Sequence, residues 1–305
     1  MGAQRIAVIG AGLMGHGIAL TFARSGHTVR VSDPMPEARA ALPARISESL
    51  TLMGADGTAE TLARVTATET LAEAVSEADL VIEAAPEKLH LKQRIFAEAE
   101  AHAPPTAILA SNTSVMPITD IMGGLSDRTR ALGTHWWNPP HMIPLVEVIR
   151  TEWTSDPVVE TAISLLSQVG KTPVRVDKDV PGFIGNRLQH ALWREAISLV
   201  ERGICDAEAV DTVVKSCFGR RLAVLGPLEN ADLVGTDLTL DIHATVLADL
   251  EARRGPSPYL EALVAEGRLG MKSGQGFRTW TEAEAAAVRA RVATHLRRLD
   301  DILET

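Results

Sequence analysis

A glycine-rich loop close to the start of the chain constrains the fold more than any other feature of the sequence. It follows Arg5–Ile9, a continuous apolar run rich in β-branched residues, which predicts a buried strand. The segment Leu13–Ser25 then has apolar residues at helical spacing and ends at Gly26, and Thr28–Ser32 is typical of a second strand. A strand, a helix and a strand joined this tightly predict parallel strands connected by a right-handed crossover.

The same alternation continues through the first part of the chain. We expect further strands at Asp79–Glu83, Ala107–Ser111, Arg130–Thr134, Leu145–Ile149 and Pro173–Val176. We expect helices between them, among them Leu91–His102 and Val158–Gly170. Buried strands that alternate with helices predict an α/β domain with a doubly wound, Rossmann-type sheet.

The pattern changes after Lys178, because no later stretch is typical of a strand. The expected helices there are Phe183–Gly203, Asp206–Cys217, Leu228–Arg253 and Thr281–Leu303. We therefore place a domain boundary in the polar, proline-marked stretch 177–182. It separates an α/β domain at residues 1–178 from an all-α domain at residues 179–305.

Composition excludes several classes of protein. Of the 305 residues, 46% are hydrophobic and 23% are charged, which is ordinary for a globular protein and not for a disordered one. The net charge of −9 disfavours nucleic acid as a partner. Two cysteines are too few for a disulfide framework and fit a reducing, cytoplasmic compartment. The start of the chain is too short and glycine-rich to be expected as a signal sequence or membrane span.

The loop itself has the pattern G-x-G-x-x-G over Gly10–Gly15, directly after a predicted strand and at the start of a helix. In a dinucleotide site Gly10 allows the tight turn, Gly12 lets pyrophosphate approach, and Gly15 lets helix and strand pack closely. The free N–H groups at the helix start, including those of Leu13 and Met14, favour an anion. The alternative is a glycine turn that binds no cofactor.

Asp33 ends the second predicted strand, where a carboxylate can accept hydrogen bonds from a ribose diol and repel a 2′-phosphate. No arginine follows at residues 34–37, so we expect NAD rather than NADP. The alternative is that Asp33 only caps the turn before Pro34.

His135 follows a predicted strand, and Glu147 lies in the next one. An antiparallel return through Asn138–Pro140 would bring the two together as a general-base pair, in which the carboxylate fixes the imidazole tautomer. A zinc site at His135 and His141 is a weaker alternative, because no third Cys or His ligand is near in the sequence. We therefore expect no metal. His135 could also be structural, with Trp136 and Trp137 simply in the core.

Several motifs of this chain occur in the same order in the 3-hydroxyacyl-CoA dehydrogenase superfamily, which the sequence resembles over nearly its whole length. The matching segments are Gly10–Gly15, Ser111–Val115, His135–Glu147, Pro181–Arg187, Gly226–Glu229 and Lys272–Phe277. The resemblance implies an NAD-dependent oxidoreductase that converts a secondary alcohol to a ketone. It also implies a homodimer formed through the helical domain, with a small molecule as substrate.

The resemblance assigns four residues to the chemistry. His135 takes the position of the catalytic base and Glu147 that of its orienting partner. Ser114 takes the position of the serine that hydrogen-bonds the reacting oxygen, and Asn186 that of the asparagine near the substrate carbonyl. Read from the residues alone, Ser114 and Asn186 could instead be helix caps.

Three further residues are matched to the coenzyme by resemblance. Glu87 and Lys92 take the positions of a pair on the NAD side, and Lys272 that of a lysine reaching the cofactor from the second domain. The alternative for Glu87 and Lys92 is a solvated helix face.

Two features concern the substrate. The segment 34–78 holds three basic and seven acidic residues, which disfavours the phosphates of coenzyme A. The stretch Gly219–Pro227 resembles branches of the superfamily that act on free acids, such as carnitine dehydrogenase and the lambda-crystallin relatives. The segment from Trp137 to His141 likewise resembles a branch that dehydrogenates a pyridine carboxylate. Arg221 would then clamp a substrate carboxylate, unless it is a surface arginine or pairs with Glu229.

Three functions therefore remain open at this level. The favoured substrate is a small hydroxy acid with a free carboxylate, and the alternative is a short 3-hydroxyacyl-CoA. A non-catalytic NAD-binding protein is a rival of another class. It is disfavoured because all four residues matched to the chemistry are present.

Overall fold

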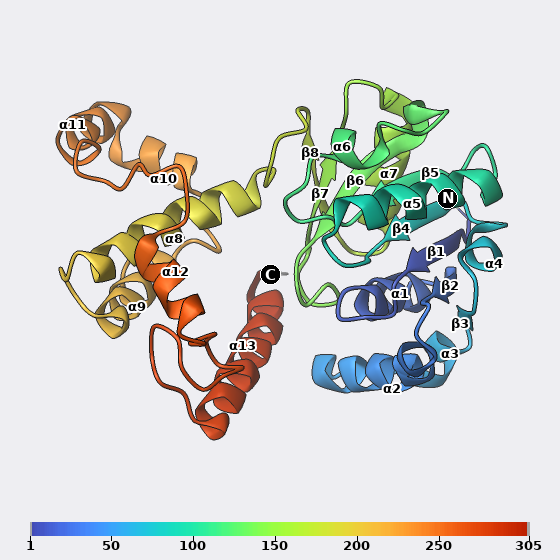
Figure 1. Cartoon of the computed structure of the whole chain (residues 1–305), viewed down its shortest axis with the longest axis horizontal. Coiled ribbons are helices and arrows are strands. Elements are labelled where there is room, and N and C mark those ends of the chain that lie inside the picture. Colours follow the sequence, from blue (N-terminus) through green and yellow to red (C-terminus); the bar gives the residue numbers. More distant parts are fainter. Residues whose placement is uncertain (1, 304–305) are drawn as a thin grey trace. The chain divides into compact units, whose positions relative to one another are not determined.

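The computed structural model describes residues 2–303 and contains two compact units (Figure 1). One unit runs to Arg187 and includes the end of the last helix from Ala293, and the other is Leu188–Val292. This division lies later than the boundary predicted at Lys178. The reason is that the turn after Lys178 is bound to the first unit, since Glu147 accepts the N–H groups of Ile184 and Gly185.

The first unit is built on an eight-stranded sheet with the order β3-β2-β1-β4-β5-β6-β7-β8. Neighbouring strands are parallel except β6 and β7, which are antiparallel. The strands are β1 (Arg5–Ile9), β2 (Thr28–Ser32), β3 (Val65–Thr68), β4 (Leu80–Glu83), β5 (Ile108–Ser111), β6 (Ala131–Trp136), β7 (Leu145–Ile149) and β8 (Thr172–Val176). The predicted doubly wound α/β fold is confirmed, and β3 is the strand that was not predicted.

Helices cover both faces of this sheet (Figure 1). Alternate residues of each strand enter two cores: Ile6 and Val8 pack with α1, α2 and α7, whereas Ala7 and Ile9 pack with α4, α5 and α6. The helices of this unit are α1 (Gly15–Arg24), α2 (Pro36–Met53), α3 (Thr58–Leu62), α4 (Leu71–Val75), α5 (Leu89–His102), α6 (Ile118–Met122) and α7 (Asp156–Gln168). The carboxyl ends of β1, β2, β4 and β5 therefore lie along one edge, where α/β sheets bind ligands.

The rest of the chain is helical, as predicted, and appears from yellow to red in Figure 1. Its helices are α8 (Gly185–Glu201), α9 (Ala207–Ser216), α10 (Pro227–Val234), α11 (Thr236–Val246), α12 (Pro258–Ala265) and α13 (Glu282–Leu303). The single helix expected at Leu228–Arg253 is wrong, because Gly235 breaks it at φ 101°, a conformation that favours glycine.

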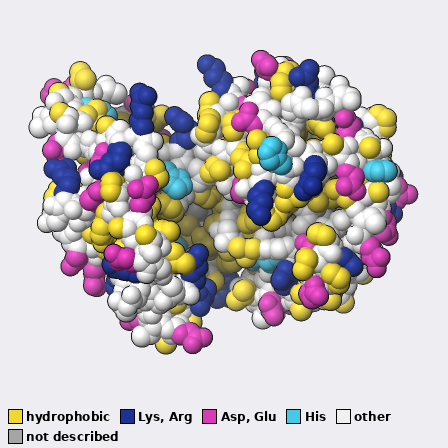
Figure 2. All heavy atoms as spheres, in the orientation of Figure 1, with side chains coloured by type: hydrophobic (Ala, Val, Ile, Leu, Met, Phe, Trp, Pro, Cys, Tyr) yellow, Lys and Arg dark blue, Asp and Glu magenta, His cyan; other side chains and the backbone are white. Residues whose placement is uncertain are grey.

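The helical unit buries few apolar side chains of its own. Among the described residues of Leu188–Val292, the buried hydrophobic ones are Leu263 and Ala285. Many large apolar side chains there are exposed, including Leu228, Leu233 and Leu240 at 69–80% exposure. Figure 2 shows part of this apolar surface in yellow. Within residues 2–303, no helix is both long and apolar enough to cross a bilayer.

Candidate active site

The glycine loop joins β1 to α1 and has the shape that a dinucleotide requires. Gly10 has φ 112°, and a Cβ atom on Gly15 would lie 1.7 Å from the Gly10 carbonyl oxygen. A Cβ on Gly12 would have no neighbour within 4 Å, so this side of the loop is open to a ligand. Within residues 2–303, the main-chain N–H groups of Leu13 and Met14 form no hydrogen bond. The loop therefore fits a bound pyrophosphate.

Asp33 connects the end of β2 to this loop. Its Oδ2 accepts the Ala11 N–H at 2.8 Å, and its Oδ1 accepts the Met35 N–H at 2.9 Å. The second bond is the turn cap that was considered as an alternative role. Each carboxylate oxygen can accept a further hydrogen bond, so the cap and a contact with a ribose diol are compatible.

Two arginines of α2 also reach the coenzyme end of the sheet, and sequence reasoning missed both. Arg45 Nη1 donates to the Ala11 carbonyl at 2.6 Å, and Arg39 Nη1 donates to the Asp33 carbonyl at 2.8 Å. Both lie in segment 34–78, whose net charge is negative. Helical spacing gave no signal for them, because residues six positions apart lie about 120° apart around a helix axis.

His16 holds the same loop from α1. Its Nδ1 lies 2.9 Å from the Gly12 carbonyl oxygen, so Nδ1 is the protonated nitrogen and donates. Its Nε2 then accepts from the Ser49 hydroxyl at 3.1 Å. Burial lowers the pKa of His16, which keeps the ring neutral in this arrangement.

His135 and Glu147 meet across the antiparallel pair β6–β7, as the sequence predicted. They are paired residues in the sheet register, and His135 Nδ1 lies 2.7 Å from Glu147 Oε2. His135 lies inside β6 rather than after it, because the strand runs to Trp136. Both side chains are buried, at 4% and 1% exposure.

The second oxygen of the Glu147 carboxylate is held by the main chain. Its Oε1 accepts the N–H groups of Ile184 and Gly185 at 2.8 and 3.0 Å. Burial alone would raise the pKa of Glu147, but the hydrogen bonds from His135, Gly185 and Ile184 together lower it below its ordinary value. Glu147 is therefore ionised at neutral pH and fixes the proton of His135 on Nδ1, leaving Nε2 free to act as a base.

Aromatic rings flank the imidazole. Trp137 and Phe183 lie at ring-centroid distances of 5.1 and 5.6 Å from His135. A Cβ on Gly185 would lie 2.4 Å from the Trp137 ring, so this glycine permits the contact. Trp136 belongs to the core, as one of the alternatives had it.

The zinc alternative is not supported. Within the described part of the chain, no cluster of three metal-ligating side chains occurs. His141 instead packs against His16 at a centroid distance of 6.0 Å.

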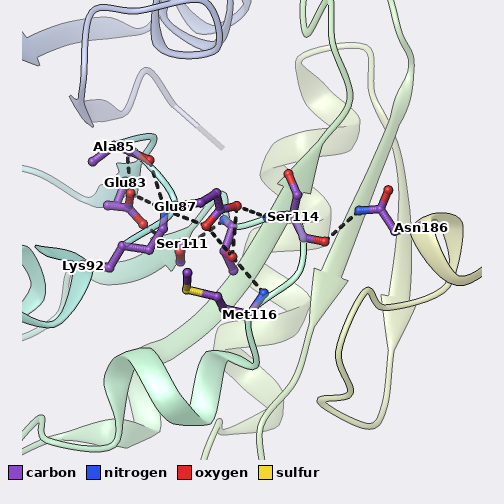
Figure 3. A network of polar contacts seen from close by, with 9 residues as sticks. Glu83, Ala85, Glu87, Lys92, Ser111, Ser114, Met116 and Asn186 are labelled. Atoms are coloured by element: carbon purple, nitrogen blue, oxygen red, sulfur yellow. Dashed lines mark hydrogen bonds and ion pairs between the residues drawn. The ribbon is translucent and has the colours of Figure 1, made fainter. Parts of the chain in front are cut away.

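The loop after β5 carries Ser114, and its main chain is bound by Glu87 and by Asn186 from the first turn of α8 (Figure 3). Glu87 Oε1 accepts the Ser114 N–H at 2.5 Å, and both oxygens of Glu87 lie within hydrogen-bond distance of the Thr113 hydroxyl. Asn186 Nδ2 donates to the Ser114 carbonyl at 2.7 Å. Since Asn186 follows Gly185, this group adjoins the pair formed by His135 and Glu147.

A buried ion pair lies beneath this loop. Glu83 and Lys92 are 0% and 1% exposed, and Lys92 Nζ donates to Glu83 Oε1 at 2.7 Å. Glu83 Oε2 accepts from the Ser111 hydroxyl at 2.7 Å, and Lys92 also donates to the Ala85 carbonyl and lies 3.6 Å from Glu87 (Figure 3). The solvated helix face considered for Lys92 is therefore wrong. Glu83 was missed, since its place at a strand end was its only signal.

Arg221 and Lys272 belong to the helical unit, and both are exposed. Glu229 closes the first turn of α10 by accepting the Gly226 N–H at 2.8 Å. Among the described residues Arg221 forms no side-chain ion pair, so the pairing with Glu229 is not present.

Comparison with protein-family models assigns the chain in two parts. Residues 5–180 match the NAD-binding domain of 3-hydroxyacyl-CoA dehydrogenase, and residues 182–280 match its C-terminal domain. The chain belongs to the 3-hydroxyacyl-CoA dehydrogenase family. It is an oxidoreductase of CH–OH groups and uses NAD.

The relatives include enzymes named for a pyridine carboxylate, for carnitine and for a hydroxyacyl-coenzyme A. A 5-formyl-3-hydroxy-2-methylpyridine 4-carboxylate 5-dehydrogenase from Mesorhizobium japonicum is 38% identical over 99% of this chain and 98% of that protein. An L-carnitine dehydrogenase from Streptomyces coelicolor is 39% identical over 76% of this chain and 74% of that protein. The human mitochondrial hydroxyacyl-coenzyme A dehydrogenase is 38% identical over 90% of each chain.

Two solved structures of relatives differ in how closely their folds superpose on this chain. A crystal structure of a 5-formyl-3-hydroxy-2-methylpyridine 4-carboxylic acid 5-dehydrogenase, described as an NAD+-dependent dismutase, superposes with a TM-score of 0.92 at 37% identity over 99% of both chains. An (S)-3-hydroxybutyryl-CoA dehydrogenase from Ralstonia eutropha gives a TM-score of 0.76 at 31% identity, over 92% of this chain and all of that chain.

Proposed function

We propose that this family member oxidises the hydroxyl group of a small acid with a free carboxylate, with His135 as the general base. The observation that carries the proposal is the buried contact of 2.7 Å between His135 Nδ1 and Glu147 Oε2. It holds the imidazole in one tautomer, so that the other nitrogen is available to remove a proton.

Each residue of the group has a role in this reaction. His135 Nε2 takes the hydroxyl proton, and Glu147 stabilises the imidazolium that forms. The Ser114 hydroxyl donates to the reacting oxygen, and Asn186 holds the Ser114 loop through its bond to the Ser114 carbonyl. NAD, when bound, accepts the hydride that leaves the same carbon.

The coenzyme would be held by the glycine loop, with the N–H groups of Leu13 and Met14 at its pyrophosphate and Asp33 at its ribose. Glu87 would face the coenzyme side. Lys92 acts through Glu87, because its ammonium is buried and bound within the chain. We retain Lys272 as a contact from the helical unit on the family resemblance.

Two observations support the free acid. The relatives include one named for a pyridine carboxylate, matched over 99% of this chain, and one named for carnitine, matched over 76% of it. Arg221 is exposed and without an ion pair among the described residues, so its guanidinium is available to clamp a carboxylate. A short 3-hydroxyacyl-CoA is the second candidate, since a probable 3-hydroxybutyryl-CoA dehydrogenase from Bacillus subtilis is also 38% identical over 92% of this chain.

The test is NADH formation against a panel that holds 3-hydroxybutyryl-CoA, carnitine, gulonate, other 3-hydroxy acids and pyridine carboxylates. The proposal is supported if a free acid is turned over, if His135→Ala abolishes that turnover, and if Arg221→Ala raises the KM for the acid. Turnover of the CoA ester alone overturns the substrate part. NADH binding without turnover of any panel member would favour the non-catalytic rival.

We also propose that the protein is a homodimer through its helical unit. In the described part of this unit few apolar side chains are buried and many large ones are exposed. An exposed apolar surface of this kind is typical of one that a partner subunit covers. Light scattering coupled to size exclusion tests it, and a mass of one chain at micromolar concentration would contradict it. Free Cys205 and Cys217 support a reducing, cytoplasmic location.

A further inference from the structure

The guanidinium of Arg39 lies at the carboxyl end of β2. Arg39 belongs to the first turns of α2, and its Nη1 donates to the main-chain carbonyl of Asp33 at 2.8 Å. Its side chain is 17% exposed, so its position is well defined by packing. A cation is therefore fixed beside the residue whose carboxylate would meet the adenosine ribose.

Glu69 faces the other side of this guanidinium. Glu69 Oε1 lies 4.0 Å from Arg39 Nη2, and the Glu69 side chain is 86% exposed. Glu69 directly follows β3, which pairs with β2 so that Ser32 is opposite Thr68. Arg39 thus spans the ends of two neighbouring strands, with the main-chain carbonyl of Asp33 at one end of the guanidinium and the carboxylate of Glu69 at the other.

We propose that Arg39 and Glu69, together with Asp33, select the coenzyme by the phosphorylation state of its adenosine ribose. An arginine near this ribose is the group that accommodates a 2′-phosphate, whereas an aspartate at the strand end accepts from the free diol. Glu69 offsets the charge of Arg39, and Asp33 repels a phosphate directly. Arg39 is thus a cation suited to a 2′-phosphate, but the carboxylates of Asp33 and Glu69 disfavour binding of that phosphate.

This inference rests on the use of NAD and not on the identity of the substrate. It predicts that removal of the two carboxylates releases Arg39 as a phosphate ligand. The chain would then bind NADPH without acquiring any new basic residue, because a guanidinium forms charge-assisted hydrogen bonds to phosphate oxygens.

The experiment measures the dissociation constants of NADH and NADPH by coenzyme fluorescence on the full chain. For Glu69→Gln we expect NADPH binding to tighten by about threefold to tenfold, with little change for NADH. In the double variant Asp33→Asn, Glu69→Gln we expect the ratio of the NADH and NADPH constants to shift towards NADPH by about 100-fold. Adding Arg39→Met to the double variant should remove most of that shift.

Glu60→Gln is the matched control, because Glu60 is an exposed carboxylate of the same acidic segment and should leave both constants unchanged. The proposal is overturned if the triple variant keeps the gain for NADPH, or if Glu69→Gln tightens both coenzymes equally. Glu69→Gln alone suffices for a decision, since Glu69 is too exposed for its exchange to prevent folding. No substrate enters the assay, so failure of the substrate proposal leaves this result readable.

Discussion

Glu147 and His135 occupy paired positions on antiparallel strands, and 2.7 Å separates Oε2 of the carboxylate from Nδ1 of the imidazole. The other carboxylate oxygen accepts two main-chain N–H groups from the turn before α8. The carboxylate is thus fixed at both oxygens, by a side chain on one and by the backbone on the other. The orientation of the base is therefore set by elements far apart in the sequence.

We expect Glu147→Gln to lower kcat by about 100-fold to 10,000-fold. A glutamine cannot satisfy both sides, because its amide nitrogen would face either the N–H groups of Ile184 and Gly185 or the Nδ1–H of His135. The imidazole would lose its fixed tautomer. Steady-state kinetics with the substrate found in the panel, together with the dissociation constant of NADH, checks this. NADH binding should change by less than about threefold, since the pair makes no contact with the glycine loop.

Glu152→Gln is the matched control for this variant. Glu152 is an exposed carboxylate shortly after β7, so its neutralisation should leave kcat unchanged. A loss in kcat below tenfold for Glu147→Gln would contradict the role given to Glu147.

Gly185→Ala should lower both stability and kcat. The new methyl group would lie 2.4 Å from the Trp137 ring, and overpacking of this kind costs about 1–3 kcal/mol of unfolding free energy. The displaced turn would also withdraw an N–H donor from Glu147. Thermal melting and kinetics measure the two effects.

Gly124→Ala is the comparison for that exchange, because a Cβ there meets no atom within 4 Å. It should change the melting temperature by no more than a degree or two. If Gly185→Ala behaves in the same way, Trp137 does not constrain the turn.

The sequence predicted the elements whose signals are local and strong. β1, β2 and β7 were predicted at their observed bounds because each is a short run rich in β-branched residues. The pairing of His135 with Glu147 could be predicted since two such strands are joined by a short proline-rich connection. A hairpin of this length determines the register within narrow limits.

Other features depend on tertiary contacts and left little local signal. β3 has the sequence Val-Thr-Ala-Thr and lies at the sheet edge, so it lacks the apolar run of a buried strand. The helix break at Gly235 was missed because one glycine is tolerated in many helices. The net charge of segment 34–78 did not reveal that Arg39 and Arg45 face the coenzyme end.

The buried pair formed by Glu83 and Lys92 yields a third prediction. Glu83→Gln leaves the Lys92 ammonium without its main partner in a site that is 1% exposed, and loss of one member of such a pair costs about 3–5 kcal/mol. Lys92→Met similarly leaves Glu83 buried and unpaired. The double variant should lose less unfolding free energy than the two single losses added together, because no lone charge remains.

Urea unfolding of the wild type and the three variants gives the required cycle. The same variants should also raise KM for NAD, since Lys92 supports Glu87 and Glu87 holds the Ser114 N–H. Strict additivity of the two single variants would show that Glu83 and Lys92 do not act as a pair.

His141 makes the stability of the protein sensitive to acid. Burial, with the nearby charges of His16 and Lys171, lowers the pKa of His141 to about 4 from its ordinary value of 6.5. The unfolded chain therefore binds a proton as the pH falls below 6.5, whereas the folded chain binds it only near pH 4. The free energy of unfolding must decrease through this window as the pH is lowered, and the contribution of His141 is fully present above pH 6.5. Because His141 is partly exposed, solvent limits the size of the effect.

We expect His141→Phe, which cannot bind a proton, to show a smaller fall in melting temperature between pH 7 and pH 5 than the wild type does. The exposed His90 on α5 provides the comparison, and His90→Phe should keep the wild-type pH dependence. His16 remains in both variants, so its lowered pKa contributes equally to each. An identical fall in His141→Phe and in the wild type would show that His141 is not the group that makes the fold sensitive to acid.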